Sequence, residues 1–365
     1  MTSRRATVRI LTVALGSSAL PLASMRSALA AEPVKVAFVY DSPIADAGWN
    51  YQHDLGRREL EKNLGGQVIT KTIENVPESA DSERVFRDLA TSGHKLIFGT
   101  TFGYMNYIVK AAKDQPATDF EHCTGYKTSK NLGVYSGRFY EGRYLTGIAA
   151  GAMTKSNILG YVAAFPIPVV LMEINAYIRG ARSVNPKAEL RVIWINTWYD
   201  PGKERAAATA LIAQGADVLT HHTNSTAVAQ TAEEKGVWVC PYDSDQHKYA
   251  PTRQLTATMQ VWGGYYTDRV RRLIAGNWTA DNTWGGIGQG MVDIAPLNPK
   301  IPSEVRAKIV QSKADIASGA LSPFAGPVVD QGGKTRVPAG QNMTDDALGQ
   351  MNYYVEGVAG RLPKS

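Results

Sequence analysis

The feature that most constrains this chain is a regular alternation of short apolar runs and amphipathic segments between Val34 and Cys240. Runs rich in β-branched and aliphatic residues recur as expected strands at 34–40, 67–73, 95–99, 132–135, 158–163, 190–196, 218–220 and 237–240. Segments with helical spacing of apolar residues lie between them, at 49–64, 79–92, 104–113, 140–153, 169–184, 203–214 and 227–235. Because strands joined by such helices pair in parallel, the pattern predicts an α/β fold with parallel sheets flanked by helices.

The alternation runs in two series, which predicts two lobes instead of a single sheet. Each series covers about 100–130 residues, the size of an ordinary domain. After Cys240 the pattern becomes irregular, with expected strands at 255–260 and 291–294 and helices at 264–275 and 304–317. We therefore expect one lobe to hold residues 31–155 with about 262–318, the other to hold residues 156–261, and residues 319–365 to form a loop and ribbon segment that packs on the lobes.

The first thirty residues have the features of an export signal. Arg4 and Arg5 give a charged start, an apolar stretch follows over 10–23, and Ala28-Leu29-Ala30 matches the small-residue pattern before a cleavage site. The apolar stretch is too short to span a bilayer, and no later segment offers eighteen consecutive apolar residues. We expect cleavage after Ala30 and release into the periplasm without a lipid anchor, since no Cys lies near that site.

The charge balance argues against a nucleic-acid partner. The charged residues of the first thirty are all Arg, so the rest of the chain carries 35 basic and 33 acidic residues and is almost neutral. No dense Lys/Arg run follows residue 30, whereas a nucleic-acid binder of this size usually has a basic face or stripe. The two cysteines, Cys123 and Cys240, fall in different expected lobes. A disulfide is chemically possible in an oxidising compartment, but we expect two buried free thiols.

Motifs of common enzymes are absent or incomplete. There is no G-x-x-x-x-G-K-[ST] phosphate loop, no G-x-G-x-x-G after the first strand and no G-x-S-x-G elbow. His221-His222 lacks carboxylates or cysteines at metal-ligand spacing. Adjacent residues of a strand point to opposite faces, so we expect one of the two His to contact a ligand and the other to be structural. We therefore expect a protein that is not an enzyme, with no catalytic residue, cofactor or metal.

The loops that follow the expected strands carry an unusual number of aromatic and amide side chains. In parallel sheets, ligands bind beyond the carboxyl ends of the strands, in the loops that lead to the helices. Here those loops cover residues 41–48, 99–103, 165–168, 197–201, 221–225 and 242–246, and they include Phe102 and His222. Rings that stack on a flat molecule and amides that contact its edge favour a planar, hydrogen-bonding small ligand.

Several of these loops resemble motifs of one family. Asp46-Ala47-Gly48-Trp49-Asn50 resembles the D-x-G-[FW]-N element of the basic membrane protein family, the substrate-binding proteins of certain ABC importers, which include purine-nucleoside receptors. Further similar segments follow in family order over almost the whole mature chain, at 99–102, 200–204, 215–218, 233–236, 243–246 and 355–358. The stretch from Asp46 to Asp54 is most similar to a branch associated with adenine-type purines.

The resemblance implies a type I periplasmic binding fold, in which two lobes close on a ligand held between them. It implies that Trp49 and a second aromatic residue sandwich the purine, the second being Trp198 or, less favoured, Tyr199. Asn50 and a polar residue near Asp46 would contact the edge of the base. The family acid that binds the ribose hydroxyls corresponds to Asp243 or Asp245. Closure would present a surface to a membrane permease, and the protein would act as a monomer.

One departure from the family pattern bears on the ligand. The family places a lysine after the strand that follows the ribose-binding acid, where this chain has Thr258-Met259-Gln260-Val261-Trp262. Without that cation the ribose hydroxyls and the acid would be less well paired, and Trp262 could fill the ribose space. We expect Gln260 and Trp262 at the ligand site, and a free purine base, adenine first, ahead of a nucleoside.

Two other interpretations stay open beside this one. The same fold could bind a sugar or a small signalling molecule, although sugar sites usually add several Asp, Asn and Arg side chains, and Arg is scarce in these loops. An exported enzyme is less well supported. A zinc deaminase, for example, needs a P-C-x-x-C element, and Cys240-Pro241 lacks the second Cys.

Overall fold

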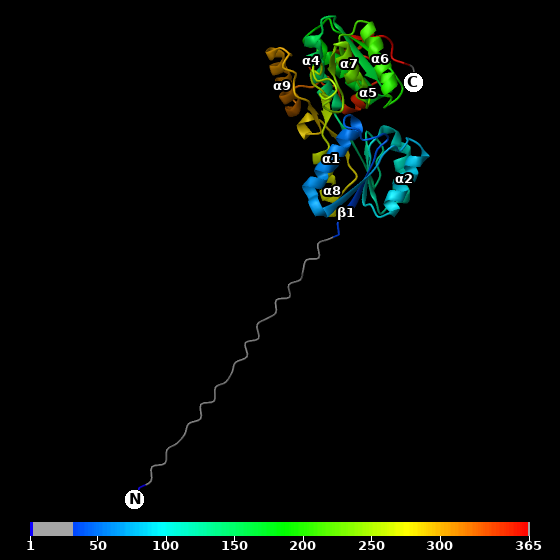
Figure 1. The fold of residues 1–365 in the computed structure, drawn as a ribbon, viewed down its shortest axis with the longest axis vertical. Helices are drawn as coiled ribbons and strands as arrows, with labels where there is room; N and C mark the ends of the chain where they lie inside the picture. The colour runs from blue at the N-terminus through cyan, green and yellow to red at the C-terminus, as the bar shows by residue number, and fades with distance from the viewer. Residues whose placement is uncertain (3–31, 364–365) are drawn as a thin grey trace. The chain divides into compact units, whose positions relative to one another are not determined.

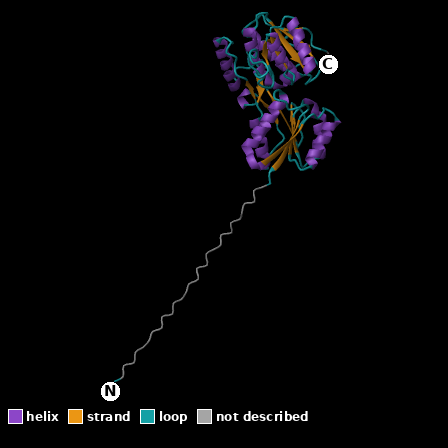
Figure 2. Ribbon diagram, in the orientation of Figure 1, coloured by secondary structure: helices purple, strands orange, loops and turns teal. Residues whose placement is uncertain are grey.

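The fold is taken from a computed structural model that describes residues 1–2 and 32–363. The expected signal peptide and its cleavage site at Ala30 lie outside the described residues. Strands and helices alternate through most of the described chain, as the sequence predicts (Figure 2). None of the helices in this part is long and apolar enough to cross a membrane.

The first sheet has six parallel strands in the order β11-β5-β4-β3-β1-β2. Its strands are β1 (Val34–Val39), β2 (Val68–Ile73), β3 (Leu96–Gly99), β4 (Asp119–Cys123), β5 (Leu132–Gly137) and β11 (Asn282–Gly285). One face packs on α1 (Trp49–Leu64) and α8 (Gly263–Ile274), and the other on α2 (Ala80–Thr91) and α3 (Met105–Asp114). Both faces are covered, which is why the central strands β1 and β3 are mainly apolar.

The second sheet has five parallel strands in the order β15-β7-β6-β8-β9. Its strands are β6 (Ile158–Ala163), β7 (Glu189–Trp194), β8 (Val218–His221), β9 (Trp238–Cys240) and β15 (Val358–Ala359). One face packs on α4 (Phe139–Met153) and α5 (Pro168–Arg182), and the other on α6 (Pro201–Ala213) and α7 (Ala227–Lys235). The described chain therefore contains two α/β lobes, each built on a parallel sheet. The α/β fold class predicted from the alternation is confirmed.

The remaining elements connect or extend the two sheets. Strands β10 (Thr258–Gln260) and β12 (Val292–Ile294) form an antiparallel pair, and the 3-10 turns are η1 (Gly65–Gln67), η2 (Phe102–Tyr104) and η3 (Ile287–Gln289). The C-terminal part holds the antiparallel ribbon of β13 (Val328–Val329) and β14 (Thr335–Val337) and the short helix α10 (Asp345–Gly349). Its last strand, β15, joins the second sheet beside β7.

The helices α4 and α9 (Ser303–Ser318) both pack on the second sheet's side of the molecule. Figure 1 shows α1, α2 and α8 around one sheet, and α4 to α7 with α9 around the other. Both helices were expected in the first lobe, because the apolar stripe of an amphipathic helix does not reveal which of two sheets it covers. From the packing we place the lobe boundaries near Gly137, Trp262 and Gly285 instead.

Two strands of the first sheet, β4 and β11, were not predicted from the sequence. Strand β4 contains Asp119, Glu121 and His122, a composition that is unusual for a central strand. Glu121 and His122 are buried with partners: Glu121 accepts hydrogen bonds from Tyr265 (2.9 Å) and Trp278 (3.0 Å) and is paired with Arg269, and His122 Nε2 lies 2.8 Å from the Thr101 carbonyl oxygen. These partners come from distant parts of the chain, so sequence periodicity gave no sign of them.

The cysteines are both buried and free. Cys123 ends β4 in the first sheet and Cys240 ends β9 in the second. The expectation of two free thiols is confirmed.

Buried histidines make the stability of the fold depend on pH. Burial lowers the pKa of His122 to about 4 and that of His221 to about 3, and it also depresses the pKa of His53. Below about pH 6.5 the unfolded chain therefore binds protons that the folded chain does not, so stability falls as the pH drops from 7. Each such group would remove about 2 kcal/mol from the free energy of unfolding at pH 5.

This pH dependence can be measured by urea unfolding at pH 7 and pH 5. We expect His122→Gln to reduce the loss between the two pH values. His247→Gln is the matched control, because His247 is exposed and its replacement should leave the loss unchanged. An equal loss in the wild type and His122→Gln would contradict a neutral, buried His122.

Candidate functional site

A small cavity lies where loops of the two lobes meet. Its wall is formed by Trp49, Thr101, Phe102, Thr124, Phe139, Val169, Trp198, His222, Asn224 and Tyr242. Most of these residues directly follow parallel strands of one sheet or the other, and the rest begin a helix. The cavity therefore occupies the position beyond the carboxyl ends of the strands where α/β folds bind ligands.

Aromatic rings from both lobes dominate the wall. Trp49, at the start of α1, lies edge-on to Phe139 with ring centroids 5.8 Å apart, and its Nε1 donates a hydrogen bond to the Thr100 carbonyl oxygen (2.7 Å). Trp198, after β7, lies edge-on to Phe165 at 4.9 Å. These contacts fix the planes of the two indoles. Ligand binding therefore has only a small entropy cost for ordering these side chains.

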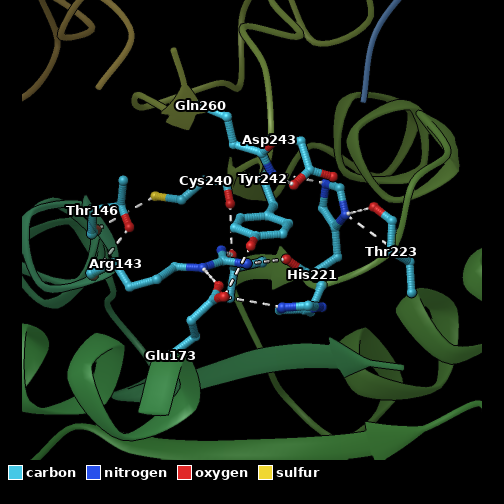
Figure 3. A network of polar contacts seen from close by, with 11 residues as sticks. Arg143, Thr146, Glu173, His221, Thr223, Cys240, Tyr242, Asp243 and Gln260 are labelled. Carbon is cyan, nitrogen blue, oxygen red and sulfur yellow. Dashed lines mark hydrogen bonds and ion pairs between the residues drawn. The ribbon is translucent and has the colours of Figure 1, made fainter. Parts of the chain in front are cut away.

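A buried polar network supports the wall on the side of the second lobe (Figure 3). The Arg143 guanidinium pairs with Glu173 (Nε to Oε2, 2.8 Å) and lies over the Tyr242 ring at 3.8 Å. The Tyr242 hydroxyl donates to Glu173 Oε1 (2.9 Å), and His222 Nε2 lies 3.0 Å from the same oxygen. Burial alone would raise the pKa of Glu173, but His222 and Arg143 hold it below its ordinary value. Glu173 is therefore an ionised, acceptor-only group.

The two lobes touch each other beside the cavity. The Gly48 N–H, in the first lobe, donates to Ser244 Oγ in the second lobe (2.8 Å). A Cβ atom added to Gly48 would lie 2.4 Å from the backbone oxygen of Asn224, which is also in the second lobe. Gly48 has a φ of +95°, a value that favours glycine. The structure is therefore a closed arrangement, with backbone against backbone at this point.

Four of the residues expected from the sequence line the cavity together. Trp49, Phe102, Trp198 and His222 all contribute to its wall. His221, by contrast, is fully buried, with Nδ1 2.9 Å from the Thr223 carbonyl oxygen.

Three other expected residues lie outside the cavity wall. The Asp46 carboxylate is exposed and binds Lys248 and the Tyr249 hydroxyl (2.5 Å) of the second lobe. Asn50 is buried and donates to Asp41 Oδ1 (3.0 Å) and to Ser42 Oγ (2.8 Å). Tyr199 is 40% exposed. Asp46 thus contacts the other lobe, and Asn50 stabilises the loop after β1.

The group expected around the ribose position is also outside the wall. Asp243 is fully buried with a φ of +68°, and burial raises its pKa. Gln260 donates to Asp243 Oδ1 (2.7 Å) and accepts from Trp262 Nε1 (2.9 Å). Trp262 is stacked on His53 at 5.0 Å, within the core of the first lobe. These three residues form a chain of hydrogen bonds behind the site.

Six lining residues were not named from the sequence: Thr101, Thr124, Phe139, Val169, Asn224 and Tyr242. Thr101, Asn224 and Tyr242 fall in the loops predicted to bind ligand, so the rule for parallel sheets could have included them. Thr124 follows the missed strand β4. Phe139 and Val169 lie in the first turns of α4 and α5, and no sequence signal separates them from core residues.

The sequence matches a known family over most of its length. The family of PnrA-like substrate-binding proteins of ABC transporters, called Bmp, matches residues 33–322. The chain belongs to this family. The family consists of ABC transporter substrate-binding proteins, so this member is a substrate-binding protein of an ABC transporter and not an enzyme. Such proteins bind small-molecule ligands and work with a permease.

Two curated relatives are similar over nearly the whole chain. A purine-binding protein of Brucella abortus is 46% identical over 338 residues, which is 93% of this chain and 96% of the relative. A putative ABC transporter glucose-binding protein of Haloferax volcanii is 39% identical over 333 residues, which is 91% of this chain and 82% of the relative.

Solved structures of solute-binding proteins share the fold. That of an ABC transporter solute-binding protein from Aeropyrum pernix has a TM-score of 0.68 at 18% identity, covering 80% of this chain and 93% of its own. One from Conexibacter woesei has a TM-score of 0.64 at 20% identity, covering 79% of this chain and 98% of its own. The two-lobed type I periplasmic binding fold expected from the resemblance is confirmed.

Proposed function

We propose that this protein captures a purine base, with adenine as first choice, in the periplasm and delivers it to an ABC permease of the inner membrane. The observation that carries the proposal is the closed, aromatic cavity with Trp49 and Trp198 contributed by opposite lobes. A ligand that contacts both indoles stabilises the closed form, because only closure brings the two lobes onto it. The purine-binding name of the 46% identical relative supports the same ligand class.

The preference for a base over a nucleoside rests on the groups available for a ribose. A ribose needs polar partners for its hydroxyls, since buried hydroxyls without partners are unfavourable. Asp243, the acid expected to supply them, accepts a hydrogen bond from Gln260 at Oδ1 and is not among the residues of the cavity wall, although its Oδ2 has no partner in the described structure. Apart from His222, the ring-bearing wall residues are Trp, Phe and Tyr, which suit a flat heterocycle.

A sugar is the second candidate, and one observation favours it. The Haloferax volcanii relative at 39% identity carries a glucose-binding name. Sugar sites also stack a pyranose ring on Trp. The wall here includes no Asp, Glu, Lys or Arg among its ten residues, whereas sugar hydroxyls usually require several such groups.

The test is calorimetric titration of residues 31–365, refolded to remove any bound ligand, with adenine, hypoxanthine, guanine, adenosine and glucose. We expect adenine to bind most tightly. Base–aromatic stacking contributes about 1–3 kcal/mol, so Trp198→Ala should weaken adenine binding by about 5- to 150-fold.

Tyr199→Ala is the matched control, because Tyr199 is the neighbouring aromatic and lies outside the wall. It should leave the affinity within about twofold of the wild type. Tighter binding of adenosine than adenine would overturn the free-base proposal. Binding of glucose alone would overturn the purine proposal.

A further inference from the structure

His222 is the wall residue whose two ring nitrogens differ in their contacts: one contacts Glu173, and the other has no hydrogen-bond partner within the described residues. Its Nε2 lies 3.0 Å from Glu173 Oε1, while its Nδ1 is buried and lacks a hydrogen-bond partner. The side chain is 7% exposed, and the ring forms part of the cavity wall. A buried polar atom with no partner is unfavourable, so such an atom at a binding cavity indicates a ligand contact.

Glu173 determines which nitrogen of His222 carries the proton. An ionised carboxylate accepts hydrogen bonds and donates none, so the nitrogen that faces it must be Nε2–H. Arg143 already compensates the charge of Glu173, with its Nε 2.8 Å from Oε2.

We propose that Glu173 holds His222 as the Nε2–H tautomer, so that Nδ1 is a lone-pair acceptor that selects ligands presenting an N–H group to this part of the wall. The inference rests on the proposed purine function and deepens it. His222 is the specificity-determining residue, and Glu173 is a positioning residue that acts through it. A planar nitrogen heterocycle with a free ring N–H or an exocyclic amine can donate a hydrogen bond to Nδ1. A ligand whose edge carries only hydrogen-bond acceptors cannot.

The tautomer can be read directly by ¹⁵N NMR of the imidazoles in the ligand-free protein at pH 7. The His222 signals are assigned by their loss in His222→Phe, which keeps an aromatic ring at the position. We expect a protonated, pyrrole-type Nε2 and an unprotonated, pyridine-type Nδ1. A proton on Nδ1, alone or together with one on Nε2, would overturn the proposal whether or not a purine binds.

Glu173→Gln provides a sharper test because it is nearly isosteric. The Arg143 Nε–H requires an acceptor, so it fixes the Gln carbonyl oxygen on its side and turns the amide NH₂ toward His222. Nε2 must then accept, and the proton moves to Nδ1. We expect the two ¹⁵N signals to exchange their types in this variant; an unchanged pattern would show that Glu173 does not control the tautomer.

Selectivity supplies the functional readout. The probes are adenine, 6-methylpurine, in which a methyl replaces the exocyclic amine, and 9-methyladenine, in which a methyl replaces the ring N–H. In the wild type, we expect the affinity for one of the two analogues to be at least about 10-fold lower than the affinity for adenine. In His222→Phe, we expect the affinities for that analogue and for adenine to differ by no more than about 3-fold. Equal penalties in both proteins would exclude His222 as the selecting group. If none of the three probes binds the wild type, the purine proposal fails, and the NMR result still decides the tautomer.

Discussion

Replacing Gly48 by alanine will weaken ligand binding by about 100- to 1000-fold, because the added methyl group blocks closure of the lobes. The new Cβ would lie 2.4 Å from the Asn224 backbone oxygen of the opposite lobe. Both atoms belong to backbone or are attached directly to it, so no side-chain rotation relieves the overlap. In an open form the contact is absent. The substitution therefore destabilises the closed, ligand-bound form selectively. Affinity is measured by calorimetric titration with adenine.

Gly93→Ala is the matched control for this experiment. Gly93 has a φ of +91°, close to the +95° of Gly48, and no heavy atom lies within 4 Å of its added Cβ. Both variants place an alanine at a positive φ, but only Gly48→Ala has a steric contact between the lobes. Equal affinities for the two variants would show that closure does not require the approach of Gly48 to Asn224.

Replacing Arg143 by methionine will lower the free energy of unfolding by about 3–5 kcal/mol, the range found when one partner of a buried ion pair is removed. Arg143 is fully buried and donates to Glu173 (2.8 Å), to Thr220 Oγ1 (2.9 Å) and to the His221 carbonyl oxygen (2.6 Å). Methionine fills much of the volume but leaves Glu173 as a buried acid without its compensating charge. Urea unfolding followed by circular dichroism measures the loss.

Arg205→Met is the control for the ion pair. Arg205 pairs with Glu234 at 2.6 Å, a comparable distance, but its side chain is 45% exposed. Exposed pairs contribute about 0–1 kcal/mol, so this variant should unfold close to the wild type. If Arg143→Met were no less stable than Arg205→Met, the network behind the cavity wall would not be an ionic one.

The fold class was accessible from the sequence because it depends on local pattern. Strands buried on both faces require continuous apolar runs, and the helices that cover them require an apolar stripe, so the alternation itself specifies parallel α/β lobes. The lobe assignment of α4 and α9 was wrong, since the choice between two sheets depends on which faces meet in three dimensions. Strand β4 was missed because its polar residues are paired with groups far along the chain.

The candidate site likewise combines features that local sequence pattern indicates with features that depend on contacts in the folded chain. Trp49, Phe102, Trp198 and His222, which the sequence predicts to contact the ligand, line the cavity, because they lie in loops or first helical turns at the carboxyl edge of the sheets. Asp46, Asn50 and Asp243 were equally well placed in the sequence. Their side chains instead bind other residues of the chain: Lys248 and Tyr249 for Asp46, the loop after β1 for Asn50, and Gln260 for Asp243.

The sequence by itself determined the two-lobed α/β fold, the family and the edge of the sheets at which the cavity lies. Those properties follow from short-range periodicity and from loop position along the chain. Only the tertiary structure decided which polar residues line the cavity and which ring nitrogen of His222 has no hydrogen-bond partner within the described residues. That choice depends on partners such as Glu173, which lies 49 residues from His222 in sequence but 3.0 Å away in the folded protein.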